Sequence, residues 1–160
     1  MQPTSIAYTS QQVDLYMDEF KKMCQERNLR ITRQRTEVFR ALISSIEHPG
    51  AEAVFEVVRR TLPNISLDTV YRTLASLEEA GLITRVGISN QARYDAHTEP
   101  HYHFVCTQCG EVYDIFLPEG EPVAIPSEDV EKFGKVMAVN LQFRGVCTHC
   151  QETAKDCKNQ

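Results

Sequence analysis

Four cysteines form two pairs with the spacing of metal ligands: Cys106 with Cys109, and Cys147 with Cys150. Two thiolates three residues apart can turn toward one ion, and two such pairs complete a closed tetrahedral sulfur site, which zinc favours. Gly110 follows the first pair, where a left-handed residue would let the chain turn around the ion. Because the two pairs are far apart in sequence, this zinc would join distant elements and have a structural role.

Two disulfides, or an iron-bearing electron carrier of the rubredoxin kind, are the alternatives for these cysteines. The first twenty residues contain no apolar core of a secretory signal, so the sequence favours a cytoplasmic protein in which thiols stay reduced. An electron carrier would leave most of the 160 residues without a task. Cys24 and Cys157 have no partner at ligand spacing, and we expect the first within a helix and the second in a C-terminal tail.

His101 and His103 lie two residues apart in a predicted strand just before the first cysteine pair. Their imidazoles then point to the same face, which is the geometry that two ligands of one ion require. Further candidate ligands lie near this strand in the sequence or at predicted element boundaries: His48, Asp95 and Asp114. Three imidazoles with two carboxylates suit iron(II) or manganese(II). A metal-free surface pair is the alternative, and His97 and His149 are predicted to be exposed.

The charge is distributed unevenly along the chain. Residues 1–88 carry 11 basic and 11 acidic side chains, whereas residues 89–160 carry 6 basic and 11 acidic ones and account for the net charge of −5. Residues 27–40 nevertheless contain five arginines and a single acid, Glu37. Phosphate is the expected partner of such a cluster, and a solvated helical face is the alternative. No apolar run approaches the length of a membrane span.

The first half is predicted to form four helices. They cover about 11–27, a segment from behind Thr32 that carries Val38, Leu42 and Ile46 on one face, about 51–61, and a segment from behind Ser66 to Gly81. The third would bury Val54, Val57, Val58 and Leu62. The fourth would bury Val70, Leu74 and Leu77, and would expose a polar face made of Asp68, Thr69, Arg72 and Ser76 with Tyr71 and Thr73 at its flanks.

The segment 82–96 alternates between apolar and polar residues around a turn, as a two-stranded hairpin would. Helices followed by such a hairpin predict a winged helix, whose recognition helix enters the major groove of DNA. The second half contains strand-like segments at 102–106, 111–116 and 136–147 and a short predicted helix at 127–133. We therefore predict an α+β protein with a winged-helix DNA-binding domain over 1–92 and a metal-binding dimerisation domain, stapled by zinc, over 93–160.

Ordered motifs give the chain a likeness to a known family. They include RITRQR at 30–35, HP at 48–49, SLDTVYRTL at 66–74, AGL at 80–82, RYD at 93–95, HYHFVC at 101–106, CG at 109–110 and GVC at 145–147. Over about residues 15–152 the sequence resembles the ferric uptake regulator family of metal-dependent repressors, and within it the peroxide-sensing branch.

The resemblance implies particular roles for particular residues. The structural zinc ligands map onto Cys106, Cys109, Cys147 and Cys150, and the regulatory iron or manganese ligands onto His48, Asp95, His101, His103 and Asp114. Aspartate at position 114 goes with peroxide sensing, by oxidation of His48 or His101, whereas glutamate goes with iron sensing. The expected DNA contacts are Arg30, Arg33, Arg35, Thr69, Tyr71 and Arg72. The expected partners are a second copy of the chain and a palindromic operator.

Three positions depart from the family pattern. Arg33 replaces a proline, Tyr102 replaces an acid between the paired histidines, and segment 136–141 lacks a histidine that contributes to a third metal site in many relatives. One zinc and one regulatory metal per chain are therefore expected. An iron-responsive repressor of the same fold is the main alternative, and a zinc or nickel sensor is the next. A non-haem iron enzyme and a zinc-bound interaction module are the alternatives from other classes, although the chain is predicted not to be an enzyme.

Overall fold

The computed structural model describes residues 8–45, 47–87, 92–97, 101–116, 130, 132–134 and 141–156. The chain forms two compact units. The helical unit consists of residues 5–86 and 92–98, and the sheet unit consists mainly of residues 99–160. Within the described part of the chain, we find no helix with both the length and the apolar character needed to cross a bilayer.

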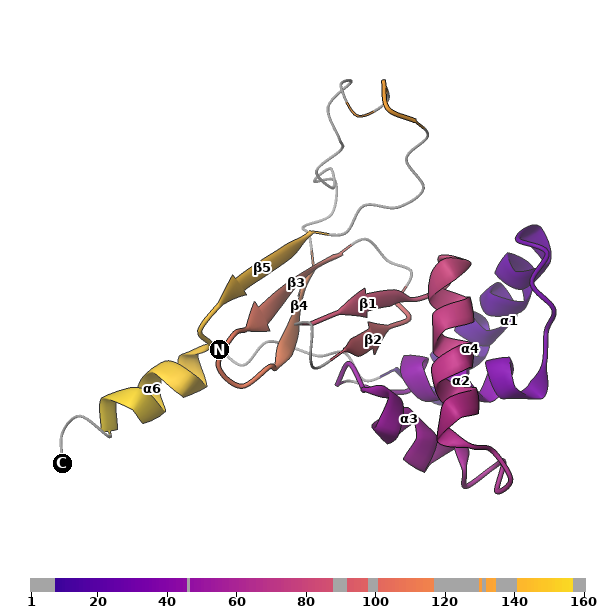
Figure 1. Ribbon diagram of the computed structural model, residues 1–160, viewed down its shortest axis with the longest axis horizontal. Coiled ribbons are helices and arrows are strands. Elements are labelled where there is room, and N and C mark those ends of the chain that lie inside the picture. Colours follow the sequence, from indigo (N-terminus) through magenta and orange to yellow (C-terminus); the bar gives the residue numbers. More distant parts are fainter. Residues whose placement is uncertain are drawn as a thin grey trace. The chain divides into compact units, whose positions relative to one another are not determined.

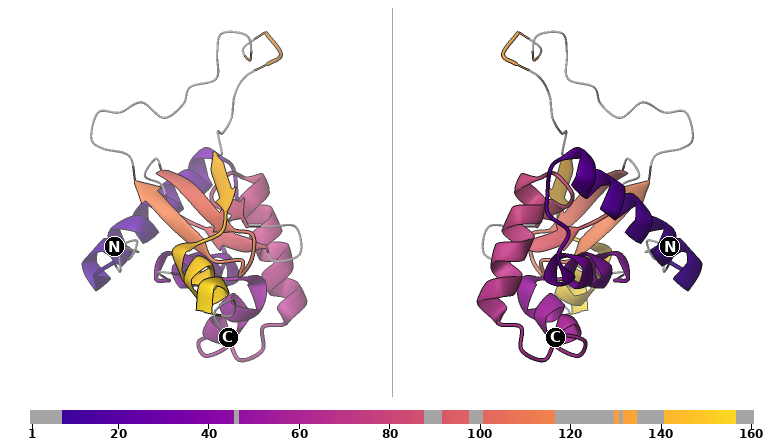
Figure 2. Two further views of the ribbon diagram at one scale, coloured as in Figure 1. Left: turned by 90° about the vertical axis from the view of Figure 1, so that its left-hand side faces the viewer. Right: turned by 90° about the vertical axis from the view of Figure 1, so that its right-hand side faces the viewer.

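Four helices build the helical unit, as the sequence predicts: α1 (Ser10–Glu26), α2 (Arg33–Ile43), α3 (Ala51–Val58) and α4 (Leu67–Glu79) (Figures 1 and 2). Three of them begin behind a hydroxyl residue that accepts a backbone N–H of the first turn, namely Thr9, Thr32 and Ser66. Such caps satisfy donors that helix geometry leaves without partners, and each contributes about 1 kcal/mol. Gly81 ends the α4 segment with φ +64°.

The core of the helical unit lies between these helices. The rings of Phe20 in α1 and Phe39 in α2 are stacked with centroids 4.3 Å apart. The predicted inner residues of α2 and α4 are buried, namely Val38, Leu42, Val70, Leu74 and Leu77, and so is Cys24. The prediction for α3 is partly wrong, because Val57 is 48% exposed while its neighbours Val54 and Val58 are buried. Ile46 lies outside the described residues.

The polar face of α4 is rotated relative to the prediction. Thr73 is buried and donates its hydroxyl to the Thr69 carbonyl oxygen at 2.7 Å, while Ser76 accepts a hydrogen bond from Arg35. A Thr hydroxyl satisfied within its own helix can be buried at little cost. The exposed residues of α4 are therefore Asp68, Tyr71, Arg72, Ala75 and Glu79.

A hairpin follows α4, as predicted for a winged helix. Strands β1 (Thr84–Val86) and β2 (Arg93–Asp95) pair antiparallel, with Thr84 opposite Asp95. The backbone N–H of Tyr94 in β2 also donates to the Pro49 carbonyl oxygen at 3.1 Å. The hairpin thus fixes the loop that leads into α3.

The sheet unit contains a three-stranded sheet in the order β4-β3-β5. Strand β3 (His101–Cys106) pairs antiparallel with β4 (Val112–Phe116) and parallel with β5 (Gln142–Gly145). Helix α6 (Thr148–Asp156) follows β5 and was not predicted from the sequence. The helix predicted at 127–133 and the first part of the strand predicted at 136–147 lie largely outside the described residues.

Candidate functional site

The four paired cysteines meet at one point of the sheet unit. Sγ of Cys106 lies 4.0 Å from Sγ of Cys150, and Sγ of Cys109 lies 3.8 Å from Sγ of Cys147. All four sulfur atoms lie within 4.8 Å of one another. A disulfide needs sulfur atoms about 2.05 Å apart, whereas a tetrahedral zinc with bonds of about 2.3 Å places its thiolates about 3.8 Å apart. The cluster therefore fits a closed zinc site and not two disulfides.

Local backbone structure shapes this cysteine cluster. Cys106 ends β3, and the chain turns through Gly110, whose φ of +77° is the predicted left-handed conformation. The backbone N–H groups of Cys109 and Cys147 point at Sγ of Cys106, at 3.5 and 3.3 Å. Burial raises the pKa of the Cys106 thiol, but these N–H donors outweigh burial and lower that pKa to about 6. Burial and the neighbouring thiols raise the pKa of Cys150 to about 12. These N–H donors thus favour the thiolate form of Cys106, which is the form that binds a metal.

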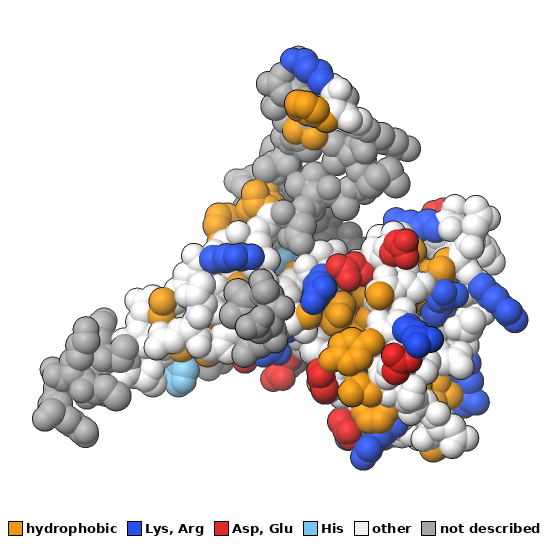
Figure 3. All heavy atoms as spheres, in the orientation of Figure 1, with side chains coloured by type: hydrophobic (Ala, Val, Ile, Leu, Met, Phe, Trp, Pro, Cys, Tyr) orange, Lys and Arg blue, Asp and Glu red, His pale blue; other side chains and the backbone are white. Residues whose placement is uncertain are grey.

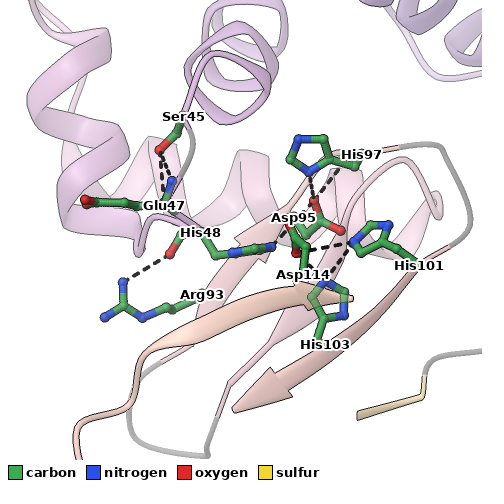
Figure 4. A network of polar contacts seen from close by, with 9 residues as sticks. All are labelled: Ser45, Glu47, His48, Arg93, Asp95, His97, His101, His103 and Asp114. Carbon is green, nitrogen blue, oxygen red and sulfur yellow. Dashed lines mark hydrogen bonds and ion pairs between the residues drawn. The ribbon is translucent and has the colours of Figure 1, made fainter. Parts of the chain in front are cut away.

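A second group of ligand atoms in the sheet unit consists of His101, His103 and Asp114, and we call it the sheet triad (Figure 4). Nε2 of His101 lies 3.0 Å from Nε2 of His103, which confirms that both imidazoles share a face of β3. Oδ1 of Asp114 lies 3.6 Å from Nε2 of His101 and 3.7 Å from Nε2 of His103. All three side chains are buried, so three potential ligands converge inside the protein and not on its surface.

The helical unit gathers a separate group, His48, Asp95 and His97, which we call the helical triad (Figure 4). The Oδ1 atom of Asp95 lies 4.0 Å from Nε2 of His48 and 2.5 Å from Nδ1 of His97. His48 and Asp95 are buried. Arg93 donates to the His48 carbonyl oxygen at 3.2 Å, so the hairpin holds the loop that carries this histidine.

His97 is not exposed as the sequence predicts. Its side chain is only 9% exposed and contacts the carboxylate of Asp95. The signal that could have found it is its place two residues after Asp95 at a strand end, where an aspartate commonly accepts a nearby backbone N–H. His149, in contrast, is exposed as predicted.

Both triads offer imidazole nitrogen and carboxylate oxygen, and neither includes a thiolate. This donor set suits a divalent ion such as iron(II) or manganese(II), whereas the cysteine cluster suits zinc. The described residues thus hold two chemically distinct kinds of candidate metal site.

The exposed face of α4 carries Tyr71 and Arg72, two of the residues that the sequence predicts to contact DNA. Tyr71 is 44% exposed, and its hydroxyl donates to Oε1 of Glu52 in α3 at 2.5 Å. The Arg72 side chain is 81% exposed, and its Nε lies 3.0 Å from Oδ2 of Asp68 one turn earlier. Figure 3 shows Lys and Arg side chains on the surface of the helical unit with acidic and hydrophobic side chains between them. A phenol and a guanidinium on one helix face match the contacts that a major-groove helix makes.

The arginines near the start of α2 fall into two groups. Arg30 and Arg33 are exposed, and Arg33 makes only a long contact of 3.5 Å with the Thr61 carbonyl oxygen. Arg35 instead donates to the Arg30 carbonyl oxygen at 2.7 Å and to Oγ of Ser76 at 2.9 Å. Its guanidinium links α2 to α4 inside the unit. Thr69 bonds with Oγ of Ser66 at 2.8 Å beside the N-terminus of α4.

A winged-helix unit with exposed arginines, together with a sheet unit that carries a tetrathiol cluster and a histidine–aspartate group, defines a metal-containing regulator of the winged-helix class. Residues 26–143 match the ferric uptake regulator family. The chain belongs to this family, and it is a metal-responsive regulator of transcription and not an enzyme.

Individual relatives agree with this family membership. The chain is 30% identical over 141 residues to the peroxide-responsive repressor PerR of Staphylococcus epidermidis, which covers 88% of this chain and 93% of that protein. Its fold is similar to that of the Helicobacter pylori ferric uptake regulator, with a TM-score of 0.62, 25% identity and coverage of 94% and 97% of the two chains. The Campylobacter jejuni peroxide stress regulator gives a TM-score of 0.56, 26% identity and coverage of 84% and 98%.

Proposed function

We propose that the protein is a cytoplasmic repressor that binds palindromic operator DNA as a homodimer and releases it when hydrogen peroxide oxidises a metal-ligating histidine. The observation that carries this proposal is the sheet triad, in which the short acid Asp114 lies beside two imidazoles. Aspartate at this position goes with peroxide sensing in the family. The 30% identity to a peroxide-responsive repressor adds support.

Two metals with different tasks belong to this proposal. The cysteine cluster would hold zinc, whose closed thiolate shell stabilises the sheet unit and leaves no position for a reactant. Iron(II) or manganese(II) would take its ligands from both units: His48 and Asp95 from the helical triad and the three members of the sheet triad. One regulatory ion with ligands from both units would restrict how the units move relative to each other.

This restriction is the proposed switch. A dimer with two recognition helices binds a palindrome only when the helices are correctly spaced. Metal binding by ligands from both units would favour the arrangement that binds DNA. The coupling free energy between metal binding and DNA binding would be about 1 to 3 kcal/mol, as is typical of allosteric proteins. Tyr71 would then contact a thymine methyl group and Arg72 a guanine or a phosphate. The exposed Arg30 and Arg33 would bind phosphates.

Peroxide would act on the ligands themselves. Bound iron(II) would activate hydrogen peroxide, so that one peroxide oxygen is added to the imidazole of His48 or His101 and the other leaves as water. An oxidised imidazole is a poor ligand, so the restraint between the units would be lost and the operator released. Manganese(II) reacts poorly with peroxide, so the manganese form would stay bound.

An iron-responsive repressor of the same fold is the second candidate, because family membership alone allows it. Such a protein would bind DNA in proportion to iron supply without any change in histidine mass. The two candidates therefore differ in one covalent modification.

The test begins with a DNA duplex selected from a random pool by the manganese-loaded protein. Binding to this duplex is then measured for the iron and manganese forms before and after a low dose of peroxide, with mass mapping of the His48 and His101 peptides. Loss of binding and a gain of one oxygen only with iron would support the peroxide sensor. Unchanged binding and mass would instead assign the protein to the iron-responsive class.

A further inference from the structure

His97 makes two hydrogen bonds to a single oxygen atom of Asp95. Its backbone N–H donates to Oδ1 at 2.9 Å, and Nδ1 of its ring lies 2.5 Å from the same Oδ1. Because a carboxylate only accepts, the ring proton of a neutral His97 is on Nδ1. Both donors belong to His97, which lies two positions after Asp95, the last residue of β2. One carboxylate oxygen is therefore held by two N–H groups of known direction.

The ring of His97 is itself fixed on its other side. It packs against Tyr8, with ring centroids 5.2 Å apart and planes tilted by 42°. The hydroxyl of Tyr16 in α1 donates to the Tyr8 hydroxyl at 3.2 Å, and the two tyrosine rings lie 4.8 Å apart. The His97 side chain is thus enclosed between Asp95 and the aromatic pair, which distinguishes it from a surface histidine.

The placement of the proton on Nδ1 decides which role His97 can have. A nitrogen that carries a hydrogen-bonded proton cannot also donate its lone pair to a metal, so Nδ1 of His97 is not a ligand atom in this arrangement. The bonds from His97 instead hold Oδ1 of Asp95, which also lies 4.0 Å from Nε2 of His48, and so fix the orientation of the carboxylate beside that imidazole. Carboxylates that bind metals are commonly held in this way, and loss of the supporting group typically weakens metal binding 10–100-fold.

We propose that His97 is a positioning residue of the regulatory metal site, which holds the Asp95 carboxylate in its ligating orientation through the Nδ1–H bond. This inference rests on the proposed function, since it assumes that Asp95 is a regulatory ligand. It adds a residue beyond the ligands that the family pattern supplies. It also connects the Tyr8–Tyr16 pair at the start of the chain to the metal site through one side chain.

Substitutions at position 97 can distinguish the effect of the Nδ1–H donor from the effect of the packing of the ring. His97→Asn retains a side-chain N–H close to the position of Nδ1, whereas His97→Phe retains the ring and its packing on Tyr8 but has no donor. Every variant keeps the backbone N–H that also bonds to Asp95. The matched control is His149→Phe, because His149 is exposed and distant in sequence from Asp95.

The experiment titrates manganese(II) into the zinc-loaded full-length protein and follows binding by electron paramagnetic resonance. We expect His97→Phe to weaken manganese binding 10–100-fold, His97→Asn to restore most of the affinity, and His149→Phe to match the parent. Thermal unfolding of the zinc form without manganese identifies any variant that is merely misfolded. Nitrogen NMR of the same manganese-free form is a second readout, and it should show His97 protonated at Nδ1.

Asp95→Ala distinguishes the failure of this inference from the failure of the proposed function. If Asp95→Ala binds manganese as tightly as the parent, Asp95 is not a ligand and the proposed site is wrong. If Asp95→Ala loses binding while His97→Phe retains the parent affinity, only the role of His97 is overturned. A His97 ring protonated at Nε2 and deprotonated at Nδ1 would also overturn it, whatever the titration gives.

Discussion

Asp114 lies directly across the β3–β4 ladder from His103, with Oδ1 3.7 Å from Nε2 of that imidazole. The antiparallel register sets this pair, because residues opposite each other in a ladder have their side chains on the same face. His101 joins them two positions away on β3. The length of the acid at position 114 thus decides where its oxygens meet the two imidazoles.

Asp114→Glu should separate peroxide sensing from metal-dependent DNA binding. The extra methylene moves the carboxylate but retains its charge, so the variant should still bind the selected duplex in the presence of iron(II) or manganese(II). We expect the iron form to resist a peroxide dose that releases the parent from DNA. Gel-shift assays with mass mapping of the His48 and His101 peptides measure both effects. Parent-like oxidation of the variant would show that the length of this acid does not determine sensing.

Removal of the structural zinc should unfold the sheet unit. Cys109→Ser leaves three thiolates, and structural zinc sites contribute folding free energy directly, about 10 to 16 kcal/mol in zinc-finger peptides. The variant should therefore lose its zinc and the cooperative unfolding transition of the sheet unit. Zinc analysis and calorimetry of the purified protein measure these losses.

Cys24→Ala is the matched control for the zinc prediction. Cys24 is fully buried in the helical unit, and burial raises the pKa of its thiol. The substitution should lower stability by roughly 1 kcal/mol through a small cavity while one zinc per chain is retained. A zinc-free Cys24→Ala protein, or a Cys109→Ser protein that holds zinc with parent affinity, would contradict the assignment of the cluster.

The double variant Tyr71→Phe, Arg72→Ala should lose operator affinity. Each base contact is worth about 1 to 3 kcal/mol, so the loss from Arg72 alone corresponds to about 5- to 150-fold. Arg59→Ala is the control. Arg59 follows α3 and pairs with Glu56 of that helix, so it is not part of the exposed face of α4. Fluorescence anisotropy with the selected duplex measures the affinity. Parent-like binding by the double variant would mean that α4 does not read this DNA.

Local sequence signals were sufficient for much of the fold. As predicted, α2 begins behind Thr32, α4 begins behind Ser66, and the left-handed Gly81 ends the α4 segment. These signals could be recognised because each depends on only a few neighbouring residues. The sheet triad was also foreseeable, since the two-residue period of a strand places His101 and His103 on one face. The cysteine cluster followed from spacing alone.

Features that depend on tertiary packing could not be predicted from local sequence signals. The exposed face of α4 is rotated because Arg35 of α2 donates to Ser76 and because the Thr73 hydroxyl donates to the Thr69 carbonyl oxygen within the helix. His97 gives no periodic signal, and only the turn after β2 brings it to Asp95. Helix α6 differs from the prediction because the metal-ligand spacing of Cys147 and Cys150 favours a turn, whereas the chain from Thr148 onward is helical.

Truncation of Arg35 should lower the stability of the protein, whereas truncation of Arg33 should lower its affinity for DNA. Arg35→Ala removes the hydrogen bonds that join α2 to α4, so it should lower the free energy of unfolding by about 1.5 kcal/mol. Arg33→Ala removes an exposed cation, so stability should stay near that of the parent while DNA affinity falls. If Arg33 contacts one phosphate, the slope of log affinity against log salt should decrease by about 0.9. Urea unfolding and salt-dependent anisotropy of both variants test this division, and an unchanged salt slope for Arg33→Ala would remove Arg33 from the DNA interface.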